Sequence, residues 1–110
     1  MKITYRAPSA AGAIAGRTFA LWRYLDRLAD GWEYARDTEI AVVEEMLAEL
    51  EREALRPDTA LLPSGTADFL TTVRHAVARA RITSGDTRMR HLEAAERSLQ
   101  TLRGLLPAHI

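Results

Sequence analysis

Almost the whole of this 110-residue chain consists of four stretches of roughly twenty residues, each apolar at helical spacing and each ending at a helix breaker. Glycine and proline break helices because one lacks a side chain and the other lacks a backbone N–H. The breakers are Gly31, Pro57 with Pro63, Ser84-Gly85, and Pro107. Amphipathic helices of this length bury their apolar stripes against one another. The pattern therefore predicts an all-α fold, a mostly antiparallel four-helix bundle.

The apolar positions recur at intervals of three and four residues, which places them on one face of each helix. The expected core residues are Ile14, Thr18, Leu21, Trp22, Leu25, Leu28 and Ala29 in the first stretch, Ile40, Val43, Met46, Leu47 and Leu50 in the second, Leu70, Val73, Val77 and Ala80 in the third, and Met89, Leu92, Ala95, Leu99, Leu102 and Leu106 in the fourth. The steps in the fourth stretch approach the heptad spacing of antiparallel bundles.

Capping residues set the expected starts of the helices. The candidate caps are Ser9 for a helix over residues 9–29, Asp37 for a helix over residues 38–55, Ser64 or Thr66 for the third helix, and Asp86, in the Ser84-Gly85-Asp86 turn, for the fourth. The connection over residues 56–64 is the longest. The second and third helices therefore need not be simple hairpin partners.

Composition supports one domain with a short N-terminal extension. With 47% apolar and 27% charged residues, the chain has material for a core and a solvated surface. Pro8 disfavours helix before it, so we expect an extended N-terminal arm over residues 1–8 and one helical-bundle domain over residues 9–110.

The sequence has no cysteine and no run of about 18 apolar residues, which favours a cytoplasmic location without membrane contact. Lys2 is the only lysine, and this arginine bias suggests a GC-rich bacterial or phage genome.

The N-terminal half of the first helix is apolar on a second side as well. Gly12, Ala15, Gly16 and Phe19 lie opposite or beside its core stripe, and one bundle covers only one side of a helix. Soluble monomers rarely leave a large apolar patch exposed. We therefore expect these four residues to form the interface of a homodimer. The alternatives are that the N-terminal arm covers them or that another protein does.

Charge is unevenly distributed although the chain is neutral overall. Residues 1–30 carry five basic and two acidic side chains, residues 31–60 three and nine, and residues 61–110 seven and four. The acidic second helix thus stands between two basic segments. Two explanations are open: compensation within the bundle, or complementary patches used in assembly.

Five arginines surround the turn between the third and fourth helices, and they are Arg74, Arg79, Arg81, Arg88 and Arg90. Arginines at helix ends contact nucleic-acid phosphates without reading base sequence. A nucleic-acid-associated subunit of a larger complex is therefore the main alternative function. The other interpretation is that these arginines neutralise the acidic second helix or solvate the end of the bundle.

His75 stands opposite the apolar stripe of the third helix and is expected to be exposed. The surrounding sequence FLTTVRHAV, residues 69–77, resembles the phospho-accepting histidine box of sensor kinases. The resemblance covers nine residues and implies phosphotransfer at His75. In that family an acidic residue follows the histidine and a proline kinks the helix, whereas this chain has Ala76 and Ala80 at those positions.

Motifs for catalysis, metal binding and nucleotide binding are missing from the sequence. None of the three histidines, His75, His91 and His109, has the glutamate three positions earlier that di-iron bundles use. A Gly-rich phosphate loop and a nucleophile–base motif are also missing. The sequence therefore predicts a small, non-catalytic interaction or regulatory subunit without metal or cofactor. It does not identify the protein partner.

Overall fold

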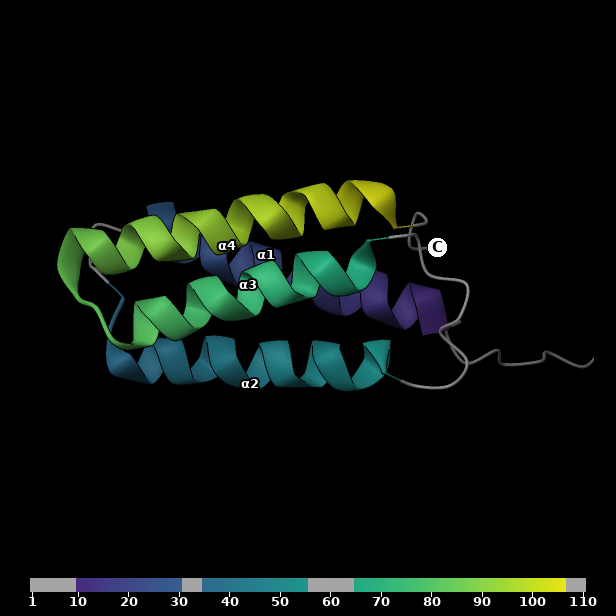
Figure 1. Cartoon of the computed structure of the whole chain (residues 1–110), viewed down its shortest axis with the longest axis horizontal. Helices are drawn as coiled ribbons and strands as arrows, with labels where there is room; N and C mark the ends of the chain where they lie inside the picture. Colours follow the sequence, from purple (N-terminus) through teal and green to yellow (C-terminus); the bar gives the residue numbers. More distant parts are fainter. Residues whose placement is uncertain (1–9, 31–34, 56–64, 107–110) are drawn as a thin grey trace, which may run out of the picture.

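The computed structural model describes residues 10–30, 35–55 and 65–106; for residues 10–12, 29 and 30 the description covers the backbone only. The helices are α1 (Ala10–Asp30), α2 (Asp37–Ala54), α3 (Thr66–Arg81) and α4 (Gly85–Leu105). Successive helices run in opposite directions (Figure 1). The described residues contain no strand, so the predicted all-α class is confirmed. The predicted arm over residues 1–8 lies outside the described ranges.

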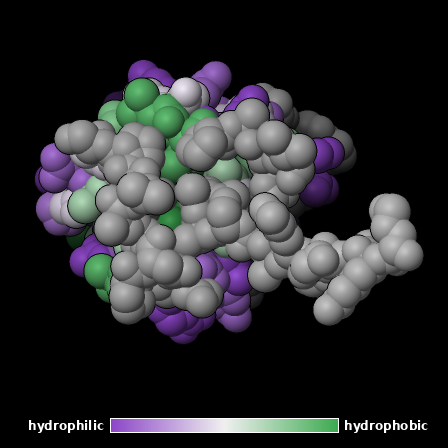
Figure 2. Space-filling view, turned by 90° about the vertical axis from the view of Figure 1, so that its right-hand side faces the viewer, coloured by the Kyte–Doolittle hydropathy of each residue, from purple (hydrophilic) through white to green (hydrophobic). Residues whose placement is uncertain are grey.

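Each helix packs against its neighbours in sequence, and α4 closes the bundle by packing against α1. At one end, which we call the turn end, the end of α1 meets the start of α2 and the end of α3 meets the start of α4 (Figure 1). The other four helix termini lie at the opposite end, which we call the open end. Figure 2 views the open end, where hydrophilic side chains flank patches of apolar surface. α2 and α3 are antiparallel neighbours despite the long connection between them.

The core is aliphatic and follows the predicted stripes. The predicted core residues with no exposed surface are Ile14, Thr18, Leu21, Ile40, Val43, Leu50, Val73, Ala80, Ala95, Leu99 and Leu102. Four more predicted residues are partly buried and pack against this cluster, namely Trp22, Leu28, Met46 and Met89. The 3–4 spacing is therefore confirmed as the signal for the buried face of all four helices.

The start of α2 corrects one predicted cap. We expected Asp37 to be the N-cap, but Arg36 occupies that position. The Glu39 carboxylate accepts the backbone N–H of Arg36 at 2.9 Å, which satisfies a donor that the helix itself leaves unpaired. Asp37 is the first helical residue instead, where a negative charge is favourable. Its carboxylate is thereby free to bind another element.

The starts of α3 and α4 correct two more predicted caps. Gly65, rather than Thr66, occupies the cap position of α3, and its φ of 89° is one that favours glycine. Ser84, rather than Asp86, precedes α4 in an extended conformation. Asp86 lies in the first turn of α4, so it stabilises the helix through its charge and not as a cap. The predicted caps outside the described residues are Ser9 and Ser64.

Candidate functional site

An aromatic pair beneath an arginine lies on the outer side of α1, where α1 meets α4. The ring centroids of Phe19 and Trp22 are 5.8 Å apart. The guanidinium carbon of Arg103, in the last turn of α4, lies 4.5 Å from the centroid of the Trp22 ring and 5.1 Å from that of Phe19. Such cation–π contacts contribute about 0.5–1 kcal/mol each at exposed sites. The three side chains therefore hold one another in place.

This arrangement leaves an exposed aromatic ring beside the Arg103 guanidinium. Phe19 keeps 41% of its surface exposed, and Arg103 is exposed as well. Arg23, one helical turn after Phe19, is also exposed. Within the described part of the chain, no carboxylate forms an ion pair with either arginine. We call Phe19, Trp22, Arg23 and Arg103 the α1–α4 surface.

The four residues predicted to form a dimer interface have different environments. Ala15 is only 7% exposed and belongs to the core of its own bundle, so it is not available to a second chain. Gly16 is half-buried and Phe19 is exposed. Gly12 belongs to α1, but its surroundings lie outside the described residues. Over residues 13–28 of α1, the exposed apolar side is thus narrower than the sequence predicts, and Phe19 lies on it.

Arg88, a member of the predicted arginine cluster, is a buried structural residue at the turn end. It is 6% exposed. Its Nε donates to the Ala80 carbonyl at 2.8 Å and its Nη1 to the Ala35 carbonyl at 3.0 Å. Its Nη2 donates to the Asp37 carboxylate at 2.8 Å. One guanidinium thus ties the start of α2 to the end of α3, and it is not accessible to a phosphate.

Two further arginines of the cluster pair with glutamates of α2. Arg74 binds Glu51, and Arg81 binds Glu44. The Arg81 Nε also donates to Glu44 at 3.3 Å, and this hydrogen bonding raises the pKa of the Arg81 guanidinium above its ordinary value. Both arginines therefore neutralise the acidic helix α2. Their position agrees with charge compensation within the bundle and not with phosphate binding.

Arg79 and Arg90 complete the cluster, and both are exposed without an ion pair in the described ranges. If these two arginines are the only phosphate contacts, the logarithm of the association constant for nucleic acid should fall linearly with the logarithm of the salt concentration. The slope should be about −1.4 for single strands and −1.8 for duplex DNA. Binding should then weaken about 7- to 12-fold between roughly 50 and 200 mM salt. Fluorescence anisotropy of labelled RNA and DNA measures this slope, and Arg79→Ala combined with Arg90→Ala should abolish it. A slope steeper than about −3 would show that more of the cluster contacts phosphate than these two residues.

The acidic α2 is neutralised by all three other helices. Arg17 of α1 donates to Glu49 at 2.9 Å and lies 3.7 Å from Glu53, while α3 and α4 supply the arginines described above. Solvent reaches these pairs, so each exposed one contributes about 0–1 kcal/mol. The uneven charge of the sequence is thus compensated within one bundle to a large extent. Glu45 differs, because it is exposed and forms no ion pair among the described residues.

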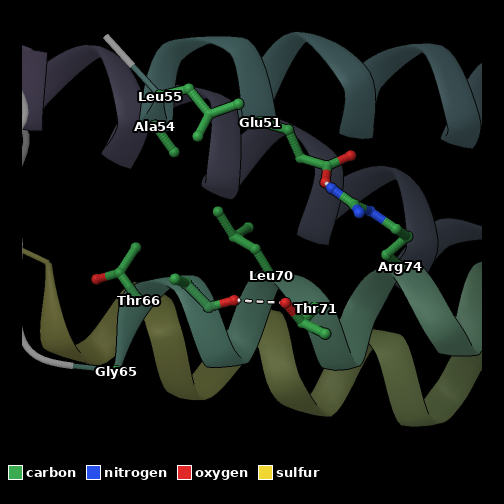
Figure 3. Close-up of a pocket in the computed structure, with 9 residues that line it drawn as sticks. Glu51, Ala54, Leu55, Gly65, Thr66, Leu70, Thr71 and Arg74 are labelled. Atoms are coloured by element: carbon green, nitrogen blue, oxygen red, sulfur yellow. Dashed lines mark hydrogen bonds and ion pairs between the residues drawn. The ribbon is translucent and has the colours of Figure 1, made fainter. Parts of the chain in front are cut away.

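A cavity of about 380 Å³ opens between α2 and α3 at the open end. Leu70 points into it, and the Glu51–Arg74 pair bounds one side (Figure 3). The Thr71 hydroxyl donates to the Ala67 carbonyl at 2.9 Å. The remaining lining residues are Ala54, Leu55, Gly65 and Thr66. The described lining is therefore mostly apolar, and its polar side chains are those of Glu51, Thr66, Thr71 and Arg74.

His75 is exposed on α3, as predicted. Phosphotransfer needs a base within hydrogen-bond reach of the histidine, and no described side chain hydrogen-bonds to His75.

Across the described ranges, no three His, Asp or Glu side chains lie close enough to hold a metal ion. None of the helices seen there is both long and apolar enough to cross a bilayer. His109 lies outside the described residues.

Comparison with known proteins finds no relative. No family model matches the chain, and neither a curated protein nor a solved structure matches it. The surfaces described above are therefore the basis for proposing a function.

Sequence reasoning predicted Phe19 at the surface but missed Trp22 and Arg103 beside it. The spacing of Phe19 and Trp22, three residues apart, makes them neighbours on a helix and was the available signal. In an antiparallel bundle, the last turn of α4 meets the first half of α1, which brings Arg103 to the same place. The periodicity of one helix does not reveal that contact, because it depends on which helices are adjacent.

Proposed function

We propose that the protein is a non-catalytic interaction module that self-associates through the α1–α4 surface. The observation that carries this proposal is the 41% exposure of Phe19 beside Trp22 and Arg103. Aromatic residues and arginine are enriched at the energetic centres of protein interfaces. Because Arg103 already restrains both rings, these two side chains lose less conformational entropy when a partner binds them.

Small side chains beside Phe19 support the same proposal. Gly16 is half-buried and lies one helical turn before Phe19 on the same face, and Ala20, the next residue in sequence, is exposed. Another helix can therefore approach closely around the ring.

The exposed area of Phe19 indicates how strong this association is. The exposed part of the ring is roughly 80 Å², and burying it contributes about 2 kcal/mol. A Kd of 1 µM corresponds to about 8 kcal/mol. Burial of this ring is about a quarter of that value, so we expect association weaker than 1 µM, with Phe19 as its largest single contributor.

Sedimentation equilibrium of the full chain tests the proposal. We expect the average mass to rise above the 12.3 kDa of one chain as the concentration reaches high micromolar. Phe19→Ser should return the mass to that of the monomer, and Gly16→Leu should weaken association by preventing close approach. Ile82→Ser is the matched control, because Ile82 is an 81% exposed apolar residue in the α3–α4 turn, outside this surface.

Two results would contradict the proposal. One is a wild-type chain that stays at 12.3 kDa over the whole concentration range. The other is an equal loss of mass in Ile82→Ser and Phe19→Ser, because that would attribute the association to general surface hydrophobicity.

A further inference from the structure

α2 carries an outer surface of small apolar residues around one unpaired acid. Ala41, Val42 and Ala48 are exposed, Val42 by 41%. Glu45 is exposed among them; Ala41, Glu45 and Ala48 follow one line along the helix at i, i+4 and i+7. Four other glutamates of α2 bind arginines of their own chain. We call Ala41, Val42, Glu45 and Ala48 the α2 surface.

Two copies of the α1–α4 surface do not match each other in charge. Arg23 and Arg103 give each copy two cations without a carboxylate partner among the described residues. A twofold contact around Phe19 would bring four guanidinium groups together, and juxtaposed like charges cost several kcal/mol. Asp26, partly buried two turns after Phe19, forms no ion pair with either arginine among the described residues. The α1–α4 surface therefore requires an acidic counterpart.

We propose that the α1–α4 surface of one copy docks on the α2 surface of a second copy. Phe19 packs on the small side chains of the α2 surface, and Glu45 lies between Arg23 and Arg103. This contact combines apolar burial with complementary charge, which a contact between two like surfaces lacks. The inference rests on the proposed self-association and adds which surface lies opposite.

Such a contact is heterologous, because it joins two different surfaces of the same protein. Each copy in a pair keeps one surface unused, so further copies can add to both ends. The average mass should therefore rise past twice 12.3 kDa with concentration, whereas a symmetric dimer levels off there. Added salt should weaken the association, because exposed charges are screened.

Two variants, each altered on one surface only, test this arrangement. Phe19→Glu removes the ring from the α1–α4 surface, and Glu45→Arg reverses the charge of the α2 surface. Each variant alone should sediment as a 12.3 kDa monomer. An equimolar mixture should form a 1:1 heterodimer, because the intact α2 surface of the first variant binds the intact α1–α4 surface of the second. Both remaining surfaces in that pair are altered, so the mass should stop at two chains.

The controls separate this inference from the proposed function. Circular dichroism must show wild-type helix content in both variants; if either loses helix, Phe19→Ser or Glu45→Gln replaces it. Glu93→Arg, at an exposed acid of α4, should leave association unchanged. If Glu45→Arg associates like the wild type and mixing restores nothing, the head-to-tail contact is overturned while self-association stands. A monomeric wild type overturns both.

Discussion

Replacing Arg88 with methionine should lower the free energy of unfolding by about 2–5 kcal/mol. Methionine keeps an unbranched side chain in the core but donates no hydrogen bond. The carbonyls of Ala80 and Ala35, which Arg88 binds at 2.8 and 3.0 Å, would then lose a buried partner. Removing the partner of the Ala35 carbonyl costs about 1–3 kcal/mol, and the loss at Ala80 is smaller because the Thr83 hydroxyl also donates to that carbonyl at 3.3 Å. Because a domain is stable by about 5–15 kcal/mol in total, this substitution should remove a large share of that stability.

The control at Asp37 separates the carbonyl bonds from the ion pair. The Asp37 side chain is 77% exposed, so its pair with Arg88 is screened by water and Asp37→Asn should cost less than about 1 kcal/mol. Urea unfolding followed by circular dichroism measures both variants. Equal losses for Asp37→Asn and Arg88→Met would show that the ion pair, and not the carbonyl bonds, stabilises the turn end.

Leu99→Ala should cost about 2–5 kcal/mol, the range for emptying a packed aliphatic site. Leu99 has no exposed surface and lies in the core, so the substitution leaves a cavity in the core of the bundle. A loss of 1 kcal/mol lowers the Tm of a small domain by roughly 4–8 °C, and the Tm should therefore fall by at least about 8 °C.

The matched control is Leu105→Ala, on the same helix. Leu105 is 48% exposed. Its substitution should lower the free energy of unfolding by less than about 1 kcal/mol, because less buried apolar surface is lost and solvent fills the space. Thermal unfolding measures both variants. Similar melting temperatures for the two would mean that Leu99 is not packed as the structure shows.

The helices and their buried faces could be predicted from the sequence because burial follows helical spacing. Leu92, Ala95, Leu99 and Leu102 step by three, four and three residues, and all four are at most 1% exposed. The exposure of His75 follows from the same geometry, since it lies opposite the stripe of α3. The spacing of apolar residues within one helix predicts its buried face without knowing which helices lie beside it. This part of the fold can therefore be predicted from one sequence.

Arg88 shows that residue spacing predicts a buried position but not the hydrogen bonds that allow a charged residue to occupy it. The heptad seam of α4, continued four residues back from Leu92, reaches Arg88; we predicted Met89 because it is apolar. The structure places Arg88 in the seam with 6% of its surface exposed, and Met89 is only partly buried. Spacing therefore decided over hydrophobicity at this position. An arginine is tolerated there because backbone carbonyls of α3 and of Ala35 accept its hydrogen bonds, and a pattern of side chains does not show carbonyl positions.

The candidate site was predictable only where it depends on one helix. Phe19 lies on the exposed side of α1 as the periodicity indicates. Ala15 stands at the border of the stripe, and its burial depends on the packing of the bundle around α1. The pairing of Arg74 and Arg81 with α2 likewise depends on the side-by-side position of α2 and α3. These contacts are tertiary, and residue spacing within one helix carries no information about them.

The two ends of the bundle are held together in different ways, which has a mechanical consequence. At the turn end, the Arg88 guanidinium joins the start of α2 to the end of α3 through buried hydrogen bonds. At the open end, a cavity lies between α2 and α3, and the exposed Arg74–Glu51 pair is the ion pair that bounds it. Local opening begins where buried contacts are fewest. We therefore expect local opening of α2 from α3 to begin at the open end, while the hydrogen bonds of Arg88 hold the turn end together.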